Sequence, residues 1–517
     1  MRKTIPILFT FLLFINAVVS AQENTQEIVD KIINEAKENS QLENLAHHLM
    51  DRIGPRLVGT PQMDQASEWI IGTYDEWGIS AEQQVFGKWK GWERGITHVD
   101  MVSPWVRSLE AMQLAWNPNM PEAIEAEVVT IPKDLQSKAE FNTWVKNVKG
   151  KVVLAALNPF TGRPDYQWKE FALEEDYKKY RERFQKEEQE WKDYISKLGL
   201  SGNALYENLE EAGAAGIFIS YGTGIMGASR IFDAKTKSIP TINIMLEDYG
   251  LLYRLAEDGT PPTVRLFTQS KDLGEVDTHN TIARIEGSEK PEEYILLSAH
   301  LDSWDGATGA TDNGTGTITM MEVARILKEV MPQPKRTIII GHWGSEEQGL
   351  NGSRGFVEDN PDIIKNLKIA FNQDNGTGRV VNINGQGFLR AYEYMERWLD
   401  PVPDDIKKEI KTTFPGMPSS GGSDHASFTA AGVPGIFLSS LNWGYFGYTW
   451  HTNRDTYDKI VFDEVRRNVI LTAILTYMAA EDEGEISHEK RVMPKDEKGE
   501  VVSWPEQRSP TRRGRLD

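Results

Sequence analysis

Histidines and acidic residues follow three short apolar runs of this sequence, at the points where each run ends. The residues after the three runs are, in order, His300 and Asp302, then Glu346 and Glu347, then Asp374. Apolar runs of this length are typical of buried strands. In an open α/β sheet, ligands bind outside the carboxyl ends of the strands. We therefore expect these five side chains to share one site.

The composition limits the chemistry that such a site can perform. The chain contains no cysteine and nine histidines, so thiolate catalysis and thiolate metal ligands are excluded. A metal site must then use imidazole and carboxylate, a set that suits zinc and, less well, manganese or cobalt. His300, His425 and His451 lie in segments that also carry acids and glycines, and Asp312 follows in the loop after the first run.

Each of these residues also has a simpler structural explanation. His300 could be a core histidine, and the Glu346–Glu347 pair could be exposed at a helix start, where carboxylates favour the helix dipole. Asp312 and Asp374 both precede Asn-Gly, which is acceptable turn chemistry. Their common position at strand ends favours one shared site over separate explanations.

The surrounding pattern predicts an α/β fold. The expected elements are strand 294–299, helix 315–330, strand 337–342, helix 350–358 and strand 367–372. Such alternation is typical of a mostly parallel sheet with helices on both faces. We predict a mixed, mostly parallel sheet flanked by helices.

A second unit interrupts this domain. Residues 118–267 show strand and helix patterns of their own but contain no histidine. We predict that they form a smaller inserted α/β domain, and that residues 22–117 and 268–485 together form the main domain. The polar tail 486–517 is rich in charge and proline, and we expect it to be partly disordered.

The first residues are typical of a secretory signal peptide. A basic start, an apolar run and small residues before a cleavage point near Ala21 mark residues 1–21. We therefore predict export to the periplasm or the extracellular space, with an uncleaved anchor as the alternative, although the run is short for a membrane span. No other stretch of the chain could cross a bilayer, so we expect no membrane span in the mature protein.

The charge excludes some partners. The formal net charge is -20 at pH 7, and such a chain should be repelled by nucleic acid and by anionic membranes. A homodimer is one possible assembly.

The combined motifs resemble those of the two-zinc exopeptidase family that includes bacterial aminopeptidases, glutaminyl cyclases and plasma glutamate carboxypeptidase (carboxypeptidase Q). The strings that carry the resemblance include His300-Leu-Asp-Ser-Trp-Asp305, Asp312-Asn-Gly314, Ser345-Glu-Glu-Gln-Gly349, Asp374-Asn-Gly-Thr377 and His451-Thr-Asn-Arg-Asp-Thr456. The first string looks most similar to the carboxypeptidase Q branch. The inserted segment is similar to the protease-associated domain that such enzymes carry.

The resemblance implies a role for each site residue. His300 and Asp374 would bind one zinc ion, Glu347 and His451 a second, and Asp312 would bridge the two. Asp302 would hold the imidazole of His300 in the right tautomer. Glu346 would be the general base that takes a proton from a water bridging the metals.

The substrate pocket is less clearly marked. His425 could face the substrate or could only brace its loop together with Asp424. Trp304 and Tyr448 could wall a specificity pocket, and buried packing explains both equally well. His342, beside the acidic pair, is expected to be a core residue.

The implied function is that of an exported zinc exopeptidase that acts on peptides. The sequence around the expected ligands is rich in carboxylates, which can accept a free ammonium group, so we expect cleavage near a free N-terminus. The alternatives are a dipeptidase or carboxypeptidase of the carboxypeptidase Q type, with Arg379 or Arg454 binding a substrate carboxylate. A glutaminyl cyclase with one zinc ion and a receptor-like protein without metals also stay open.

Overall fold

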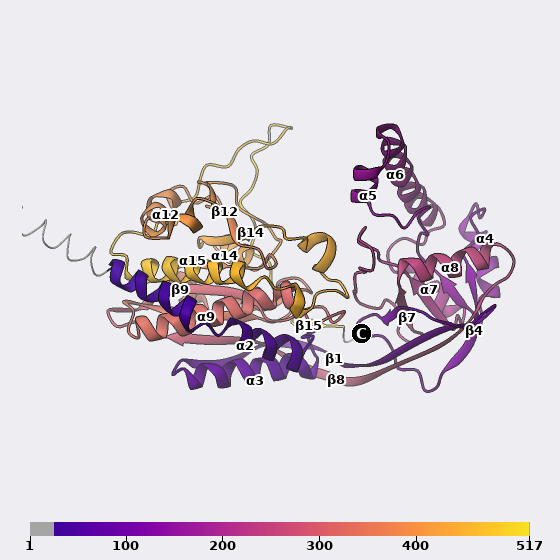
Figure 1. The fold of residues 1–517 in the computed structure, drawn as a ribbon, viewed down its shortest axis with the longest axis horizontal. Helices are drawn as coiled ribbons and strands as arrows, with labels where there is room; N and C mark the ends of the chain where they lie inside the picture. Colours follow the sequence, from indigo (N-terminus) through magenta and orange to yellow (C-terminus); the bar gives the residue numbers. More distant parts are fainter. Residues whose placement is uncertain (1–24, 516–517) are drawn as a thin grey trace, which may run out of the picture.

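The computed structural model describes residues 25–515 of the chain, and it has two lobes joined by a long pair of strands (Figure 1). We call residues 96–269 the second lobe and the remaining described residues the main lobe. The expected signal peptide, residues 1–21, lies outside the described residues.

The main lobe is built on a mixed sheet. Its central strands are parallel to one another, with the order β14, β11, β9, β10, and antiparallel strands β12 and β8 flank them. The strands that enter this lobe, of which β1 and β8 also extend into the second lobe, are β1 (Ser80–Ser103), β8 (Thr263–Ile285), β9 (Lys290–His300), β10 (Arg336–Trp343), β11 (Leu367–Asn372), β12 (Val380–Asn384), β13 (Lys411–Thr413), β14 (Gly435–Ser440) and β15 (Arg513–Gly514).

Helices cover both faces of this sheet. They are a helix at 25–38, α2 (Leu42–Ala46), α3 (Pro61–Glu76), α9 (Thr315–Val330), α10 (Asn351–Asp359), α11 (Pro361–Asn366), α12 (Ala391–Leu399), α13 (Asp404–Lys407), α14 (His425–Ala430) and α15 (Phe462–Glu481). Short helical turns also form at η1 (His47–Ile53), η3 (Ala310–Gly314), η4 (Tyr445–Thr449) and η5 (Tyr457–Lys459).

The sequence of β9 explains why two helical layers are needed. Successive side chains of a strand point to opposite faces of a sheet. Ile295 and Leu297 enter the larger core, which α9 and α15 cover, whereas Leu296 enters a smaller core with Phe356 of α10. The apolar stretch 295–297 of β9 is therefore buried on both faces, as a parallel sheet requires. The predicted α/β fold class is confirmed.

Strands β1 and β8 form an antiparallel ribbon that enters both lobes (Figure 1). The ribbon runs from the pair Ser80 and Arg284 to the pair Ser103 and Thr263. The sequence patterns of residues 81–86 and 97–102 predict two separate strands, but β1 continues through both. Register shifts between Gly91 and Trp92 and between Arg94 and Thr97 interrupt the pairing locally without ending the strand.

The second lobe has a core of its own. Four parallel strands and an antiparallel edge strand stand in the order β4, β5, β6, β7, β3. Its elements are β2 (Arg107–Ser108), β3 (Ala111–Gln113), β4 (Ile124–Thr130), β5 (Val152–Leu154), β6 (Gly216–Ile219), β7 (Thr241–Ile244), α4 (Lys138–Trp144), η2 (Val145–Asn147), α5 (Asp165–Phe171), α6 (Glu174–Lys197), α7 (Ala204–Glu211) and α8 (Leu246–Glu257).

The core of the second lobe extends beyond the boundaries that the sequence suggested. Val99 and Met101 of β1 and Leu109 are buried in the same cluster as Val128 and Phe218. The expected inserted segment 118–267 lacks the first three of these side chains, because β1 carries the chain into the lobe before residue 118.

The tail after residue 485 packs against the main lobe. Trp504 lies edge-on to Phe388, with ring centroids 5.3 Å apart, and β15 pairs in parallel with β1. We expected partial disorder here from the polar composition, which did not reveal that single tryptophan and arginine side chains would anchor the tail. Among residues 25–515, no helix combines the length and apolar character needed to cross a membrane.

Candidate metal centre

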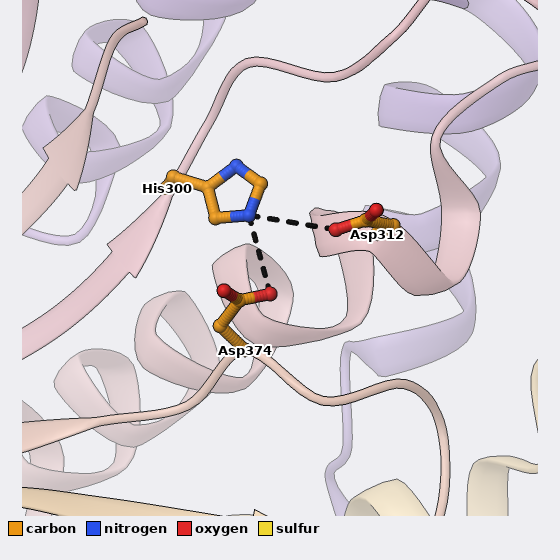
Figure 2. A group of neighbouring side chains, drawn as sticks. All are labelled: His300, Asp312 and Asp374. Atoms are coloured by element: carbon orange, nitrogen blue, oxygen red, sulfur yellow. Dashed lines mark ion pairs between the residues drawn. The ribbon is translucent and has the colours of Figure 1, made fainter. Parts of the chain in front are cut away.

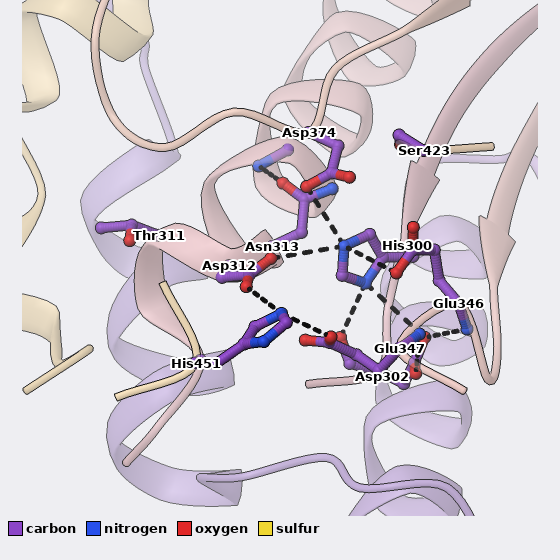
Figure 3. Close-up of polar contacts among 12 residues, drawn as sticks. His300, Asp302, Thr311, Asp312, Asn313, Glu346, Glu347, Asp374, Ser423 and His451 are labelled. Carbon is purple, nitrogen blue, oxygen red and sulfur yellow. Dashed lines mark hydrogen bonds and ion pairs between the residues drawn. The ribbon is translucent and has the colours of Figure 1, made fainter. Parts of the chain in front are cut away.

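The sheet brings the five expected side chains to one edge. His300 is the last residue of β9, beside Trp343 at the end of β10. Glu346 and Glu347 follow β10, and Asp374 follows β11. Two loops complete the group, since η3 carries Asp312 and His451 comes just after η4 (Figure 3).

A first group of possible ligands surrounds Nε2 of His300. This nitrogen lies 3.2 Å from Oδ1 of Asp374 and 3.6 Å from Oδ1 of Asp312. All three side chains are buried, and they point toward one another from three separate segments (Figure 2). Their ligand atoms are close enough to hold one metal ion.

A second group lies on the other side of Asp312. Nε2 of His451 is 2.9 Å from Oε2 of Glu347 and 3.3 Å from Oδ2 of Asp312. These three residues also form a possible metal site. Asp312 therefore belongs to both groups and directs a different oxygen atom to each histidine (Figure 3).

Several ligand atoms have no hydrogen-bond partner. Nε2 of His300, Oδ1 of Asp374, Oδ2 of Asp312 and Oε1 of Glu347 are all buried without one. Buried polar atoms are normally paired, and an exception calls for an explanation such as an ion. The close distances without hydrogen-bond geometry fit side chains that are directed at common centres. Imidazole and carboxylate donors without thiolate also fit zinc.

The pKa shifts of Glu347 and His300 also indicate a cation site. Burial raises the pKa of the Glu347 carboxyl well above its ordinary value, and the neighbouring Asp312 adds to this effect. Burial alone would lower the pKa of His300, but the carboxylates of Asp374 and Glu346 hold it well above its ordinary value. The site is thus a buried concentration of negative charge, which cations would balance.

Asp302 has a different set of contacts from the one we expected. Nδ1 of His300 donates a hydrogen bond to the backbone carbonyl of Asp302 at 2.9 Å, while the Asp302 carboxylate lies 3.6 Å away. That carboxylate instead accepts hydrogen bonds from the backbone amides of Glu346, at 3.0 Å, and Glu347, at 3.2 Å. Its side chain therefore fixes the turn that carries both glutamates, and its backbone orients the imidazole.

Glu346 differs from Glu347 in what it faces. A left-handed residue, Ser345 with φ 58°, turns the chain sharply after β10. Glu347 then points to His451, whereas Oε2 of Glu346 stays 4.0 Å from Nε2 of His300. Burial raises the pKa of Glu346 well above its ordinary value, which suits a proton acceptor.

Two further residues support the site and were missed in the sequence. Asp455 accepts hydrogen bonds from the amides of Thr311, at 2.7 Å, and Asp312, at 3.0 Å. Arg56 is fully buried and donates to four carbonyls of the loops around the site, including that of Leu301 at 2.7 Å. Asp455 stood inside a recognised string, whereas nothing near Arg56 in the sequence indicated a contact with residues 250 positions away.

The three residues expected to line a substrate pocket differ in how they contact the site. His425 is buried and stacks on Phe437, and burial lowers its pKa to about 4, so it is neutral at pH 7. The ring of Trp304 lies 6.1 Å from that of His451. Tyr448 lies below the ammonium group of Lys459, 5.7 Å from its ring centroid. Only Trp304 of these three makes a ring contact with a possible metal ligand.

The second lobe also reaches this site, through residues 229–232. The amide of Ile231 donates to the carbonyl of His451 at 2.8 Å, and the ring of Phe232 stands edge-on to that imidazole at 5.4 Å. Arg230 lies over the ring of Trp450. Sequence reasoning missed this contribution because residues 229–232 include no acid or histidine.

Comparison with known proteins relates this site to a family. The model of the family described as "Peptidase family M28" matches residues 280–475, a range that contains every proposed ligand. Carboxypeptidase Q of Rattus norvegicus is 27% identical over 469 residues, covering 89% of this chain and 90% of the relative. Human carboxypeptidase Q is 26% identical over 472 residues, with 90% of each chain covered.

Solved structures support the same fold. A peptidase M28 precursor from Shewanella amazonensis superposes with a TM-score of 0.65 at 23% identity, covering 92% of this chain and all of that one. A zinc aminopeptidase from Bacillus subtilis superposes with a TM-score of 0.55 at 18% identity, covering 87% of this chain and 97% of the other. At these identities the likeness concerns the fold.

Proposed function

We propose that this chain, a metallo-exopeptidase whose residues 280–475 match peptidase family M28, binds two zinc ions and hydrolyses short peptides next to their free N-terminus. The single observation that carries the proposal is Asp312. Its two carboxylate oxygens serve two separate groups of possible ligands, one with His300 and one with His451. A carboxylate that belongs to both groups can bridge two neighbouring cations.

The proposed ligands are divided between the two ions. His300 and Asp374 hold the first, Glu347 and His451 hold the second, and Asp312 belongs to both. Two zinc ions bound there would polarise the scissile carbonyl and lower the pKa of a water molecule between them. The backbone carbonyl of Asp302 fixes the proton of His300 on Nδ1, which leaves Nε2 free to bind metal.

Glu346 is the proposed general base. It follows a ligand-bearing strand end without itself belonging to either group of possible ligands. Its carboxylate can take a proton from the attacking water and pass it to the leaving amine. Glu347 is unsuited to that role because a carboxylate held on a cation is a weak base.

Recognition of the free amino end follows from the surplus of carboxylates. Both cations that we considered as clamps for a substrate carboxylate are engaged elsewhere. Arg379 pairs with Glu464 at 3.0 Å, and Arg454 pairs with Glu110 at 2.6 Å. A peptide ammonium group can meanwhile be accepted by acids at the site, which supports cleavage after the first residue.

A second candidate function rests on Arg230. This residue lies next to Ile231, whose amide binds the carbonyl of His451, and its guanidinium group sits over Trp450. Among the described residues it has no carboxylate partner; Nη2 donates to the carbonyl of Phe446, and Nε is buried without a hydrogen bond. A guanidinium group without a carboxylate partner, next to the loop of His451, suits a terminal carboxylate. That arrangement favours a dipeptidase or carboxypeptidase of the carboxypeptidase Q type.

A substrate panel separates the two candidates. An unblocked dipeptide, its N-acetyl form and its C-terminal amide are compared on the wild-type protein and on Arg230→Met. Aminopeptidase action predicts that acetylation abolishes cleavage while amidation and Arg230→Met have little effect. If amidation and Arg230→Met each raise KM strongly, the dipeptidase assignment replaces it. Arg265→Met is the matched control, since Arg265 is an exposed arginine of the same lobe that pairs with Glu125.

Metal content tests the proposal as a whole. Near two zinc ions per chain are expected in the purified protein, near one would favour a glutaminyl cyclase, and none would favour a receptor-like protein. Asp312→Asn should lose both ions, whereas a variant that kept one ion at full affinity would contradict the shared carboxylate.

Export is proposed on the signal-like residues 1–21, to the periplasm or the extracellular space. N-terminal sequencing of the protein from its native compartment should find a chain that begins near residue 22. Light scattering on that protein distinguishes a monomer from a homodimer.

A further inference from the structure

Residues 511–515 run from the main lobe to the second lobe. In Figure 1 the label of β15 lies between the lobes, beside the ribbon of β1 and β8. We call these five residues the strap. Parallel pairing joins Arg513 to Lys88 and Gly514 to Trp89 of β1.

The first half of the strap is anchored to the main lobe. The amide of Thr511 donates to Oδ1 of Asn351 at 2.8 Å. The guanidinium group of Arg512 binds both oxygens of Asp359 at 2.8 Å and Glu358 at 2.9 Å, all on α10. Bidentate arginine–carboxylate pairs of this kind hold geometry well.

The second half of the strap contacts the second lobe and its junction. A side chain at Gly514 would place a Cβ atom 2.0 Å from the ring of Trp89, so only glycine fits there. Arg515 lies over the ring of Trp116, 4.7 Å from its centroid. The same guanidinium group makes an ion pair with Asp233 and donates to the carbonyl of Ala234 at 2.7 Å.

Two connected paths lead from Arg515 to His451. The first is a row of rings, because Trp116 lies 6.2 Å from Trp304, and Trp304 lies 6.1 Å from the imidazole of His451. The second is the backbone of the second lobe. Asp233 is two residues after Ile231, whose amide binds the carbonyl of His451.

We propose that Arg515 is a positioning residue of the metal centre: it fixes Trp116 and the segment 229–234, and these in turn hold His451 and Phe232 in place. The function of the strap is thus to hold the second lobe closed over one side of the site. Loss of the Arg515 contacts should loosen the contact between segment 229–234 and the loop of His451 without removing any metal ligand. The inference rests on the metal centre proposed above.

Amide hydrogen exchange on the full chain tests this directly, with metal bound and again after chelation. The amide of Asn453 donates to the carbonyl of Ser229 at 3.1 Å, so it reports on the same contact as the amide of Ile231. Arg515→Ala should lower the protection of both amides by about tenfold, because the hydrogen bonds of the charged Arg515 side chain are lost. Gly514→Ala, which forces the strap away from Trp89, should have the same effect. Arg513→Ala is the matched control, since the Arg513 side chain makes its ion pair with Glu275 of β8 and not with segment 229–234, so the protection of both amides should stay unchanged.

A kinetic readout complements the exchange. If peptides are the substrates, Arg515→Ala should raise KM more than it lowers kcat, and Arg515→Lys should restore part of the loss. Because exchange needs no substrate, it can support the strap even if the proposed activity is wrong.

The proposal is overturned in either of two ways. Unchanged protection of Ile231 and Asn453 in both Arg515→Ala and Gly514→Ala would show that the strap does not position the segment. An equal loss of protection throughout the main lobe would make the strap a general stabiliser instead.

Discussion

At the scale of residues, the carboxylate of Asp312 links the two groups of possible metal ligands. The two oxygens of Asp312 face two different histidines, at 3.6 Å and 3.3 Å. The Asp312 backbone amide is held by Asp455, which is itself buried. Because the bridging residue is fixed from behind, neither group of ligands can move without the other.

Glu346→Gln should leave metal content close to that of the wild-type protein and lower turnover by roughly 10²- to 10⁴-fold, the usual contribution of a general base. Glu346 belongs to neither ligand group, so its amide should not disturb metal binding. Metal analysis and steady-state kinetics on the same preparation check this. Glu347→Gln is the control and should lose metal. Retained activity in a metal-loaded Glu346→Gln protein would exclude Glu346 as the base.

Asp302→Asn and Asp312→Asn should separate support from ligation. Asparagine at 302 can accept only one of the two amide hydrogen bonds from the glutamate turn, so metal affinity should fall by about 10- to 100-fold. Asparagine at 312 removes charge from both groups and should be worse. Zinc titrations against a competing chelator give both affinities, and the reverse order would mean that the two roles are exchanged.

The sequence predicted the candidate ligands because strand ends are visible as apolar runs followed by polar residues. His300, Glu347 and Asp374 were recognised in this way, and their common site follows from parallel strands alone. Arg56 and Phe232 were not, since each comes from a segment whose contact with the site depends on tertiary packing. The role of Asp302 was implied by the family resemblance, whereas its carboxylate accepts hydrogen bonds from amides 44 and 45 residues later in the chain.

At the scale of elements, β10 carries an unusual core residue. His342 is fully buried, and its Nε2 lies 2.8 Å from the hydroxyl of Tyr74 on α3. Burial lowers the pKa of His342 to about 3, from an ordinary value of 6.5. The imidazole therefore stays neutral in the folded state over a range in which it is protonated in the unfolded chain.

This histidine should make the protein sensitive to acid. As pH falls below about 6.5, His342 binds a proton in the unfolded state but stays neutral in the folded state. The free energy of unfolding therefore decreases until the pH reaches the folded-state pKa of about 3. The expected loss is about 1.4 kcal/mol for each pH unit. In His342→Phe the free energy of unfolding should fall less steeply between pH 6.5 and 4.5, as measured by urea denaturation.

The exposed His47, which pairs with Asp51, provides the control for that experiment. His47→Phe should keep the steep wild-type slope. An equally steep slope in His342→Phe would mean that other groups account for the acid sensitivity.

Element types were easier to predict than element limits. Helix 315–330 matches α9, because its apolar spacing is regular and Gly314 precedes it. The ribbon strand β1 was divided in two by the glycines and charges between residues 87 and 95. Residues 87–94 pair with β8, and Trp89, Gly91 and Trp92 among them are buried, so the glycines and charges there do not mark a turn.

At the scale of the whole molecule, the second lobe should be separable only with its own part of the ribbon. A fragment 96–269 contains Val99, Met101 and Leu109, which are buried in the lobe core. It should unfold cooperatively on heating and bind no zinc. The shorter fragment 118–267 lacks these side chains and should be less stable by several kcal/mol. Circular dichroism melts of both fragments check this, and equal stability would restore the narrower boundary.

The pairing of β1 with β8 has a consequence for the order of folding. Ser80 pairs with Arg284, so the far end of the ribbon joins residues about 200 positions apart, a costly loop for an unfolded chain to close. The near end, Ser103 with Thr263, closes as soon as residues 104–262 have folded. The second lobe then serves as the turn of one very large hairpin, which can zip toward β10 and the strand ends beyond it. A fault in that lobe would leave the main sheet without its neighbouring strand during synthesis, although the lobe supplies none of the proposed metal ligands.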